Sequence, residues 1–249
     1  MKKIFLTSLI LSFFFSCKTY SQVPQKELVL SKQEIKKHKS SYQKKIKNLG
    51  IVATPQYFYK HKINVNKISE FKSLGIDLVE MSKKIGSYNY KEMALFSPVI
   101  IEGVIIGKEY DTDINSYFHT SYEVKISSLI SGSTHSKDVI TIKTRSGSIG
   151  EDKYVANNNE PNYFIGEKVL LMLKPVDIEG YKKDKKNGLF YYKINAKQTD
   201  FTVNDKYTFK SNLYFDRDKK MIGKKKVVIT NLKKINRVNN RVLFNRESF

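Results

Sequence analysis

Residues 94–203 contain the feature that most restricts how this chain can fold, a series of strand-like runs. The first run holds two groups of β-branched residues, Val99–Ile101 and Val104–Ile106, which suit a pleated and packed surface. Gly103 separates the two groups at a point where a bulge or bend is expected. Three further runs follow along the chain, at Tyr117–Ile130, Asp138–Thr144 and Glu167–Leu173.

The pattern within these runs predicts how each strand is buried. From Phe118 to Ser128 every second residue falls on one face, and the polar residues between them fall on the other, as in a half-buried strand. Val169–Leu173 is apolar throughout, which fits a fully buried strand. With closing strands expected at Leu189–Ile194 and Thr199–Val203, the segment predicts a small antiparallel β-barrel. The expected core residues are Val99, Ile101, Val124, Ile126, Ile142, Leu171 and Leu173.

Two helical patterns precede the strands. Ser31–Glu34 matches a capping box, and apolar residues follow at helical spacing as far as Gly50, which sits where a C-cap belongs. The second pattern runs from Val65 to Ile85, with Gly75 placed to split it, and a short helix is expected at Tyr88–Leu95. The predicted fold class is therefore α+β, with two N-terminal helices, a five- or six-stranded antiparallel OB-like β-barrel and a short C-terminal extension.

The chain beyond the main strands carries weaker patterns. Lys182–Gly188 is predicted to be a charged hairpin loop, Tyr207–Phe215 and Lys224–Ile229 to be strands, and Thr230 to begin a short helix that extends through Ile235. The whole sequence divides into four parts: a signal peptide at 1–21, a basic helical region at 22–88, the barrel at 89–203 and a basic extension at 204–249.

The net charge of +21 is distributed unevenly over these four parts. They carry +3, +9, 0 and +9 respectively, so the surplus lies on the flanks of a neutral barrel. A barrel that binds single-stranded nucleic acid needs a basic groove with stacking aromatic side chains, and arginine is the better residue for bidentate phosphate contacts. Only five of the 45 basic residues are arginine, so we do not expect nucleic acid as the partner.

The N-terminus has the pattern of an export signal. Met1–Lys3 is basic, and the apolar stretch Ile4–Phe15 is too short to span a bilayer comfortably. Two endings remain open. Ser16-Cys17 resembles a bacterial lipobox, whose cysteine becomes lipidated and N-terminal, whereas ordinary cleavage after Ser21 would remove Cys17 with the signal. We expect lipidation at Cys17, hence a cell-envelope lipoprotein held to the membrane by its lipid, with a periplasmic or secreted protein as the alternative.

The order of the strand runs resembles a known family. The resemblance rests on Val99–Gly107, Tyr122–Gly132, Val139–Thr144 and Phe164–Leu173, about 110 residues in all. Together these segments are similar to the netrin-like OB-fold modules, which include the tissue inhibitors of metalloproteinases, and in particular to the cysteine-free versions in bacterial envelope proteins. The inhibitors place a disulfide-held N-terminal cysteine in a zinc site. With Cys17 as its only cysteine, this chain cannot form the internal disulfides that this mechanism requires.

No catalytic pattern is present in the sequence. Asp111-Thr-Asp113-Ile-Asn115 imitates the start of a calcium loop, but Ser116 and Tyr122 stand where glycine and glutamate are needed. The chain has no Gly-x-Ser-x-Gly elbow and no His-Glu-x-x-His pair, and its one cysteine belongs to the signal region. We therefore expect no enzymatic activity, no cofactor and no metal ion, with an enzyme of unrecognised site kept as an alternative.

Tyrosines gather in the expected barrel loops and give the candidate contact residues: Tyr110, Tyr117, Tyr154 and Tyr163. Aromatic side chains on loops can form a binding surface for protein or glycan. The loops Tyr110–Tyr117 and Ile149–Tyr163 are the expected surface, and the partner a protein or glycan of the cell envelope. The remaining alternative is a basic surface protein that contacts anionic lipid or nucleic acid through its flanks.

The expected export and lipidation can be tested on the mature protein. Mass spectrometry should find an acylated Cys17 at the N-terminus, and a Cys17→Ser variant should leave the membrane fraction because it lacks the acyl anchor. An unmodified N-terminus at Gln22 would contradict lipidation while leaving export in place.

Overall fold

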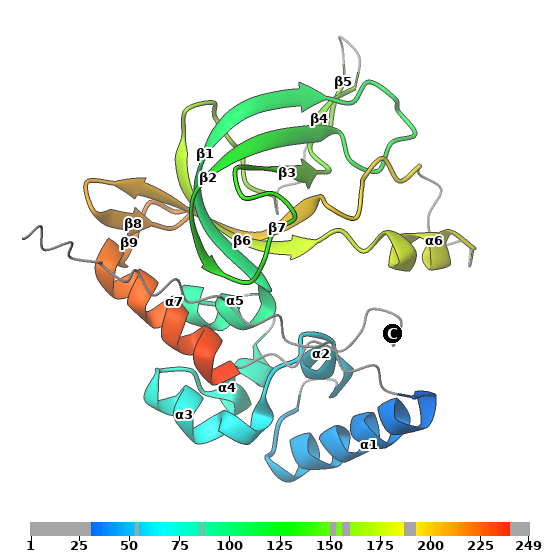
Figure 1. Ribbon diagram of the computed structural model, residues 1–249, viewed down its shortest axis with the longest axis vertical. Coiled ribbons are helices and arrows are strands. Elements are labelled where there is room, and N and C mark those ends of the chain that lie inside the picture. Colours follow the sequence, from blue (N-terminus) through cyan, green and yellow to red (C-terminus); the bar gives the residue numbers. More distant parts are fainter. Residues whose placement is uncertain are drawn as a thin grey trace, which may run out of the picture.

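The computed structural model describes residues 31–239 except 53–54, 85, 87, 150–152, 156–159 and 187–192 (Figure 1). The signal region and Cys17 lie outside the described residues. The helices are α1 (Lys32–Asn48), α2 (Pro55–Lys60), the 3-10 helix η1 (Val65–Lys67), α3 (Ile68–Ser73), α4 (Leu78–Lys83), α5 (Tyr90–Phe96), α6 (Ile178–Lys186) and α7 (Lys225–Asn239). The strands are β1 (Val99–Tyr110), β2 (Thr120–Ser131), β3 (Val139–Thr144), β4 (Gly147–Ile149), β5 (Lys153–Val155), β6 (Lys168–Pro175), β7 (Phe201–Lys210), β8 (Leu213–Phe215) and β9 (Met221–Lys224).

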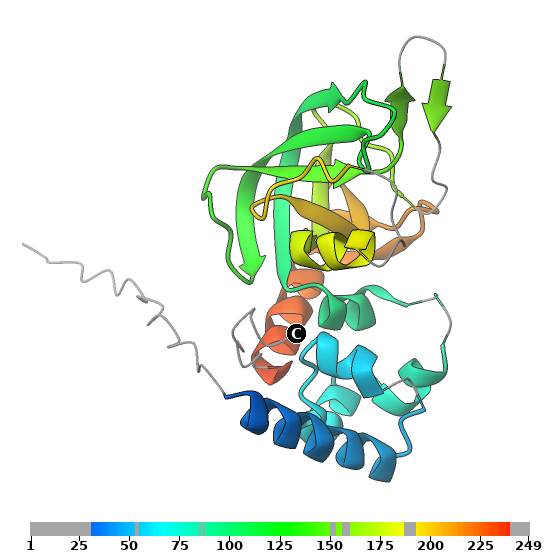
Figure 2. The ribbon, with the colours of Figure 1, turned by 90° about the vertical axis from the view of Figure 1, so that its right-hand side faces the viewer.

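The fold is α+β, built around a sheet of seven strands in the order β3-β2-β1-β6-β7-β8-β9. Neighbouring strands in this order are antiparallel. The sheet curls until β3 meets β7, where Ile142 pairs with Phe201 in a single parallel contact. The strands β1, β2, β3, β6 and β7 therefore make a partly closed ring, here called the strand ring. Figure 2 shows this curl above the helices.

Two cores share the same strands. Inside the strand ring, Val99 and Ile101 of β1 pack with Leu171 of β6 and with β2, β3 and β7. On the outer face, Ile100 of β1 and Met172 of β6 join the helices in a second core. Because successive side chains of a strand point to opposite faces, both strands must be apolar at nearly every position to serve both cores.

The helices other than α6 form a base on one side of the sheet (Figures 1 and 2). α5 and α7 lie next to the strands and contact each other, and α1 to α4 lie beyond them. The apolar stripe of α7 that faces this base is Val228, Leu232 and Ile235, each at most 1% exposed. This spacing of four and three residues is the period of an amphipathic helix.

Several local predictions are confirmed. Ser31 caps α1 with the reciprocal bonds of a capping box, and Gly50 and Gly75 adopt φ of +70° and +79° at helix ends. A register shift marks a bulge at Gly103. Of the expected core residues all are buried except Ile126, which is partly buried.

Other predictions are corrected. Five α-helices and one 3-10 helix precede β1 in the described residues, where two helices and a short one at Tyr88–Leu95 were expected. The short helix is present as α5. The expected hairpin loop at Lys182–Gly188 falls largely in α6, whose start is capped by Asp177 through a 2.9 Å bond from the Gly180 N–H. Lys224–Ile229 is not a strand, because α7 begins at Lys225. The expected strand Tyr207–Phe215 is divided between β7 and β8 by a turn.

The two closing strands expected at Leu189–Ile194 and Thr199–Val203 also differ from the structure. β7 starts at Phe201, two residues after the expected start at Thr199, and continues to Lys210. The division at 203/204 therefore falls inside a strand of the ring. Of the expected strand Leu189–Ile194, residues 189–192 lie outside the described residues, and Lys193 forms one isolated bridge with Ser116.

A substitution inside the strand ring tests the shared core. Leu171→Ala should lower the free energy of unfolding by about 2–5 kcal/mol, because Leu171 is fully buried between two strands and its removal leaves a cavity. Leu129→Ala on β2, where the side chain is 43% exposed, is the control and should change it by no more than about 0.5 kcal/mol. Equal losses in urea denaturation of the two variants would contradict this arrangement.

Candidate functional site

The expected tyrosine surface is only partly exposed. Tyr110, the last residue of β1, is 42% exposed, and the Lys108 ammonium lies 4.6 Å from the centre of its ring. The Tyr117 ring meets the Phe118 ring edge to face, with the ring centres 4.9 Å apart, and lies tilted at 46° to the Tyr181 ring of α6, with the ring centres 5.0 Å apart. Burial raises the pKa of Tyr181 to about 12, with a smaller contribution from Tyr117. The Tyr117 ring therefore packs the loop between β1 and β2 against α6.

Tyr163 lies inside the structure. It is 3% exposed, and its ring lies 4.8 Å from the ring of Tyr122 in the core of the strand ring. Its hydroxyl has no hydrogen-bond partner among the described residues. Burial raises the pKa of this phenol well above its ordinary value, and the charge of Arg217 opposes the shift. Tyr163 thus supports its loop from within and offers no contact surface. Tyr154 belongs to β5, and its side chain is not among those described.

The loop after β1, which imitates a calcium loop in sequence, is tied together internally. The Asp111 carboxylate accepts bonds from the Ser116 hydroxyl and the Asp113 N–H, both at 2.9 Å, and from the Asn195 amide. Although burial acts in the opposite direction, these bonds lower the pKa of Asp111. The Asn195 amide also bonds the backbone of Phe118 through both of its ends. The carboxylate is therefore used to join two loops.

A tight turn before β6 presents the most exposed apolar pair of the described residues. The Glu167 N–H donates to the Phe164 carbonyl at 3.0 Å, and Gly166 has φ of +85°, as a type II turn requires at its third position. The Gly166 N–H also donates to the Ile105 carbonyl at 2.7 Å, which attaches the turn to β1. Phe164 and Ile165 at the tip are 70% and 68% exposed.

A buried ion pair holds this Phe164–Gly166 turn in place. Lys206 of β7, 8% exposed at its side chain, lies with its ammonium 2.7 Å from the Glu167 carboxylate and 2.5 Å from the Asn162 carbonyl. The ammonium also lies 4.8 Å from the centre of the Tyr163 ring. Burial lowers the pKa of Lys206, and Glu167 opposes this shift. The Lys206 ammonium thus contacts Asn162 and Tyr163, which precede the turn, and Glu167, which follows it.

Two further exposed apolar or aromatic side chains lie on β1, the strand to which the turn is bonded. Ile106, next to the carbonyl that holds Gly166, is 41% exposed. We define the β1 rim as Ile106, Tyr110, Phe164 and Ile165. Of these, only Tyr110 is among the contact residues expected from the sequence. Phe164 and Ile165 fall between the expected loop Ile149–Tyr163 and the expected strand Glu167–Leu173. Gly166 is the sequence feature that could have identified Phe164 and Ile165, because a glycine here indicates a turn and the two apolar residues before it would then lie at the tip of that turn.

The comparisons with protein-family models and with curated proteins give no match to this chain. The resemblance to netrin-like modules therefore stays a prediction. Within the described residues, no three or more histidine, cysteine, aspartate or glutamate side chains are grouped so as to hold a metal ion. The same part of the chain contains no helix with the length and apolar character needed to cross a membrane.

The buried ion pair can be tested through stability. Glu167→Gln should lower the free energy of unfolding by roughly 1.5–3 kcal/mol, because a charge-assisted bond to the buried Lys206 is lost. The control is Glu80→Gln in the exposed pair with Lys83, which should cost no more than about 0.5 kcal/mol.

The pH dependence gives a second readout of the same pair. The folded pKa of Lys206 lies below its ordinary 10.5, so the unfolded chain binds more protons between the two values and stability rises with pH there. Loss of the Glu167 charge lowers the folded pKa further and widens this window. Denaturation of Glu167→Gln between about pH 8 and pH 10 should show a steeper gain than the parent protein. Equal slopes would contradict the role given to the pair.

Proposed function

We propose that this protein is an exported, lipid-anchored and non-catalytic binding module of the cell envelope, which holds a protein partner on the β1 rim. The observation that carries the proposal is the exposure of the adjacent Phe164 and Ile165, at 70% and 68%. The turn that holds them is fixed by the ion pair of Lys206 with Glu167. Apolar anchors that are held rigidly lose little conformational entropy on binding, and such residues dominate the energy of protein interfaces.

The proposed barrel supports this function. The proposed OB-like barrel is supported by five strands that form a partly open ring in the order β1-β2-β3-β7-β6 and back to β1. Folds of this kind carry binding surfaces on one face and on the loops around it. The β1 rim combines both, since Ile106 and Tyr110 lie on a strand and Phe164 and Ile165 lie on a connecting turn.

A protein fits the β1 rim better than a glycan. Sugars stack on exposed aromatic faces and need polar groups around them, whereas Ile106 and Ile165 extend this rim with aliphatic surface. The proposed location in the cell envelope is supported by the signal pattern and by the expected lipidation of Cys17. The basic flanks then raise the rate of approach to an anionic envelope without selecting the partner.

Capture from envelope extract tests the proposal. The full mature protein, immobilised through an added tag, should retain a specific protein that Phe164→Ala and Ile165→Ala reduce by roughly tenfold each, because each removes an exposed anchor. The matched controls are Met221→Ala and Val227→Ala, which alter apolar side chains of similar exposure, 60% and 54%, away from the rim. These controls should retain the partner.

The same experiment distinguishes the alternatives. Retention that is unchanged in the rim variants but falls steeply with salt would replace the proposal with contact through the basic flanks. Retention of purified peptidoglycan fragments, lost in the rim variants, would keep the β1 rim and replace the protein partner with a glycan.

A further inference from the structure

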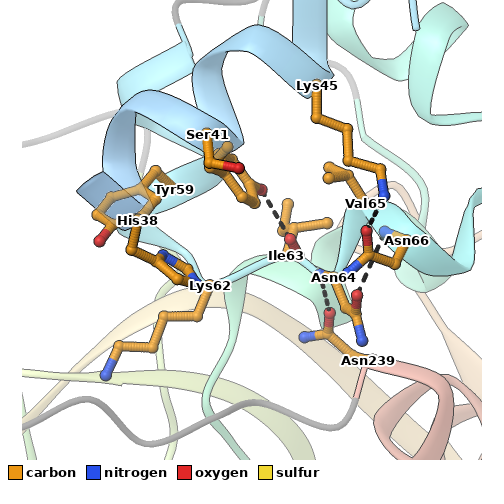
Figure 3. A pocket seen from close by; sticks show the side chains of 11 residues that line it. His38, Ser41, Lys45, Tyr59, Lys62, Ile63, Asn64, Val65, Asn66 and Asn239 are labelled. Atoms are coloured by element: carbon orange, nitrogen blue, oxygen red, sulfur yellow. Dashed lines mark hydrogen bonds between the residues drawn. The ribbon is translucent and has the colours of Figure 1, made fainter. Parts of the chain in front are cut away.

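The helix α1 lies at the end of the molecule opposite the strand ring (Figures 1 and 2). One of its faces packs onto the helical base, where Ile46 is fully buried. On the same side, the Tyr42 hydroxyl donates to the Ile63 carbonyl at 2.6 Å and the Lys45 ammonium bonds the Asn66 side chain (Figure 3). This face of α1 is therefore used within the fold.

The opposite face of α1 is exposed and basic. The helical period of 3.6 residues places four exposed lysines within about one third of the helix circumference. We define the lysine face as Lys36, Lys37, Lys44 and Lys47. The single acidic residue of α1, Glu34, lies off this face in the first turn and accepts bonds from Ser31 in the capping box. The face thus combines four positive charges with no negative one.

The four ammonium groups of the lysine face form no ion pair among the described residues. In other helices an exposed lysine pairs with a glutamate three residues away, as in Lys83–Glu80 and Lys182–Glu179. Between residues 31 and 98 every acidic side chain already holds another group of the base: Glu34, Glu70, Asp77, Glu80 and Glu92.

This arrangement is unfavourable for the helix alone. Lys44 and Lys47 are three residues apart, a spacing at which like charges repel each other across one turn. No acidic side chain of the base is left to offset this repulsion. A negatively charged surface outside the molecule would supply the missing counter-charge.

The position of α1 in the chain indicates which surface that is. Ser31, which caps α1, follows the expected lipidation site Cys17 by fourteen residues. A chain of this length reaches at most about 50 Å. A lipid on Cys17 would therefore keep α1 close to the bilayer, where its effective concentration toward the headgroups is high.

We infer that the lysine face of α1 contacts an anionic phospholipid surface, with the strand ring directed away from the membrane. The inference rests on the proposed location in the cell envelope. Clusters of roughly four to eight basic residues on one helix are typical of surfaces that bind anionic lipids, and each adds about fivefold to binding. Because the apolar side of α1 is packed onto the base, the helix lies on the headgroups without inserting.

A nucleic acid fits the lysine face less well than a lipid surface. The helix α1 contains no arginine, which is the better residue for bidentate phosphate contacts. Its one tyrosine, Tyr42, is bonded on the inner side and cannot stack on a base.

Vesicle sedimentation tests the contact. The chain from residue 17 onward, carrying Cys17→Ser so that no acyl group contributes, should bind vesicles of phosphatidylglycerol and phosphatidylcholine in equal parts. Vesicles of phosphatidylcholine alone should bind it at least about tenfold more weakly, and added salt should weaken the binding to the anionic vesicles.

Two fourfold variants connect the binding to α1. The first, which should bind anionic vesicles at least about tenfold more weakly, combines Lys36→Gln, Lys37→Gln, Lys44→Gln and Lys47→Gln. Its thermal stability should be equal or higher, because glutamine is a good helix former and the repulsion is removed. The matched control removes four exposed lysines on or beside the strands of the ring and should keep the binding: Lys125→Gln, Lys168→Gln, Lys197→Gln and Lys210→Gln.

Energy transfer tests the orientation. Because Cys17 is the only cysteine of the chain, the Cys17→Ser protein can carry a dye at one introduced cysteine. Ser40→Cys places the dye among the lysines of α1, and Ile114→Cys places it in the loop after β1, where the side chain is 53% exposed. Transfer to an acceptor on the lipid headgroups should be stronger from position 40.

Four results would overturn the inference: equal binding to anionic and neutral vesicles, equal loss of binding in the two fourfold variants, equal transfer from positions 40 and 114, or tighter binding to single-stranded DNA than to anionic vesicles. The last would assign the lysine face to a nucleic acid. Capture of a partner on the β1 rim is measured without vesicles, so failure of that proposal and failure of this contact are distinguishable.

Discussion

The rest of the structure depends on the burial of β1 on both of its faces. Val99 and Ile101 face the interior of the strand ring, and Ile100 faces the helical base. On its two edges β1 pairs with β2 and with β6. Gly103 allows this crowding, because a Cβ atom there would meet the Val124 side chain at 2.7 Å and the Lys125 carbonyl at 2.8 Å. One strand thus fixes the ring, both cores and the position of the helices.

Buried charges join the helical base and the C-terminal elements to this strand. Glu102 of β1 is 9% exposed, and its carboxylate accepts a bond from the Tyr214 hydroxyl and lies 2.8 Å from the Lys225 ammonium at the start of α7. In the base, Lys84 lies 2.6 Å from Glu92, which is also buried. Two lysines of the basic flanks thus pair with buried carboxylates, while the side chains of Lys84 and Lys225 stay 38% and 35% exposed. Removal of either carboxylate would leave a lysine without its counter-charge, so these pairs restrict how the elements assemble.

The sequence predicted the strands whose pattern is set by burial. β1, β3 and β6 were located within a few residues, because apolar alternation or a continuous apolar run reports directly on a packed surface. A helix was expected from Thr230 through Ile235, and this part of α7 is confirmed. The prediction was wrong for the first part of α7, where Val227, Val228, Ile229 and Thr230 are β-branched in succession and favour a strand locally. The segment is helical because its apolar residues pack against α5 in this conformation. The tertiary contacts therefore outweigh the local preference for a strand.

The candidate site was harder to predict, since it does not follow from a local pattern. The β1 rim joins a strand to a turn 50 to 60 residues further along the chain, and the ion pair beneath the turn comes from β7. Their meeting depends on strand pairing, which the sequence does not specify by spacing alone. The lysine face of α1 follows more directly, because the capping box at Ser31–Glu34 marks the start of the helix and the helical period then places its lysines.

The burial of Asn239 does follow from the sequence once α7 is recognised as a helix. Its buried stripe, Val228, Leu232 and Ile235, continues by the next helical step to Asn239. The periodicity that buries three apolar side chains therefore carries an amide into the interior at the same depth. Desolvation of an amide is unfavourable unless each of its groups is bonded, and the Asn64 N–H satisfies only the oxygen. A polar residue at a core position of a helix thus indicates either a structural bond or a ligand. At Asn239 the bond from the Asn64 N–H accounts for the oxygen of the side chain, and the nitrogen has no hydrogen-bond partner among the described residues.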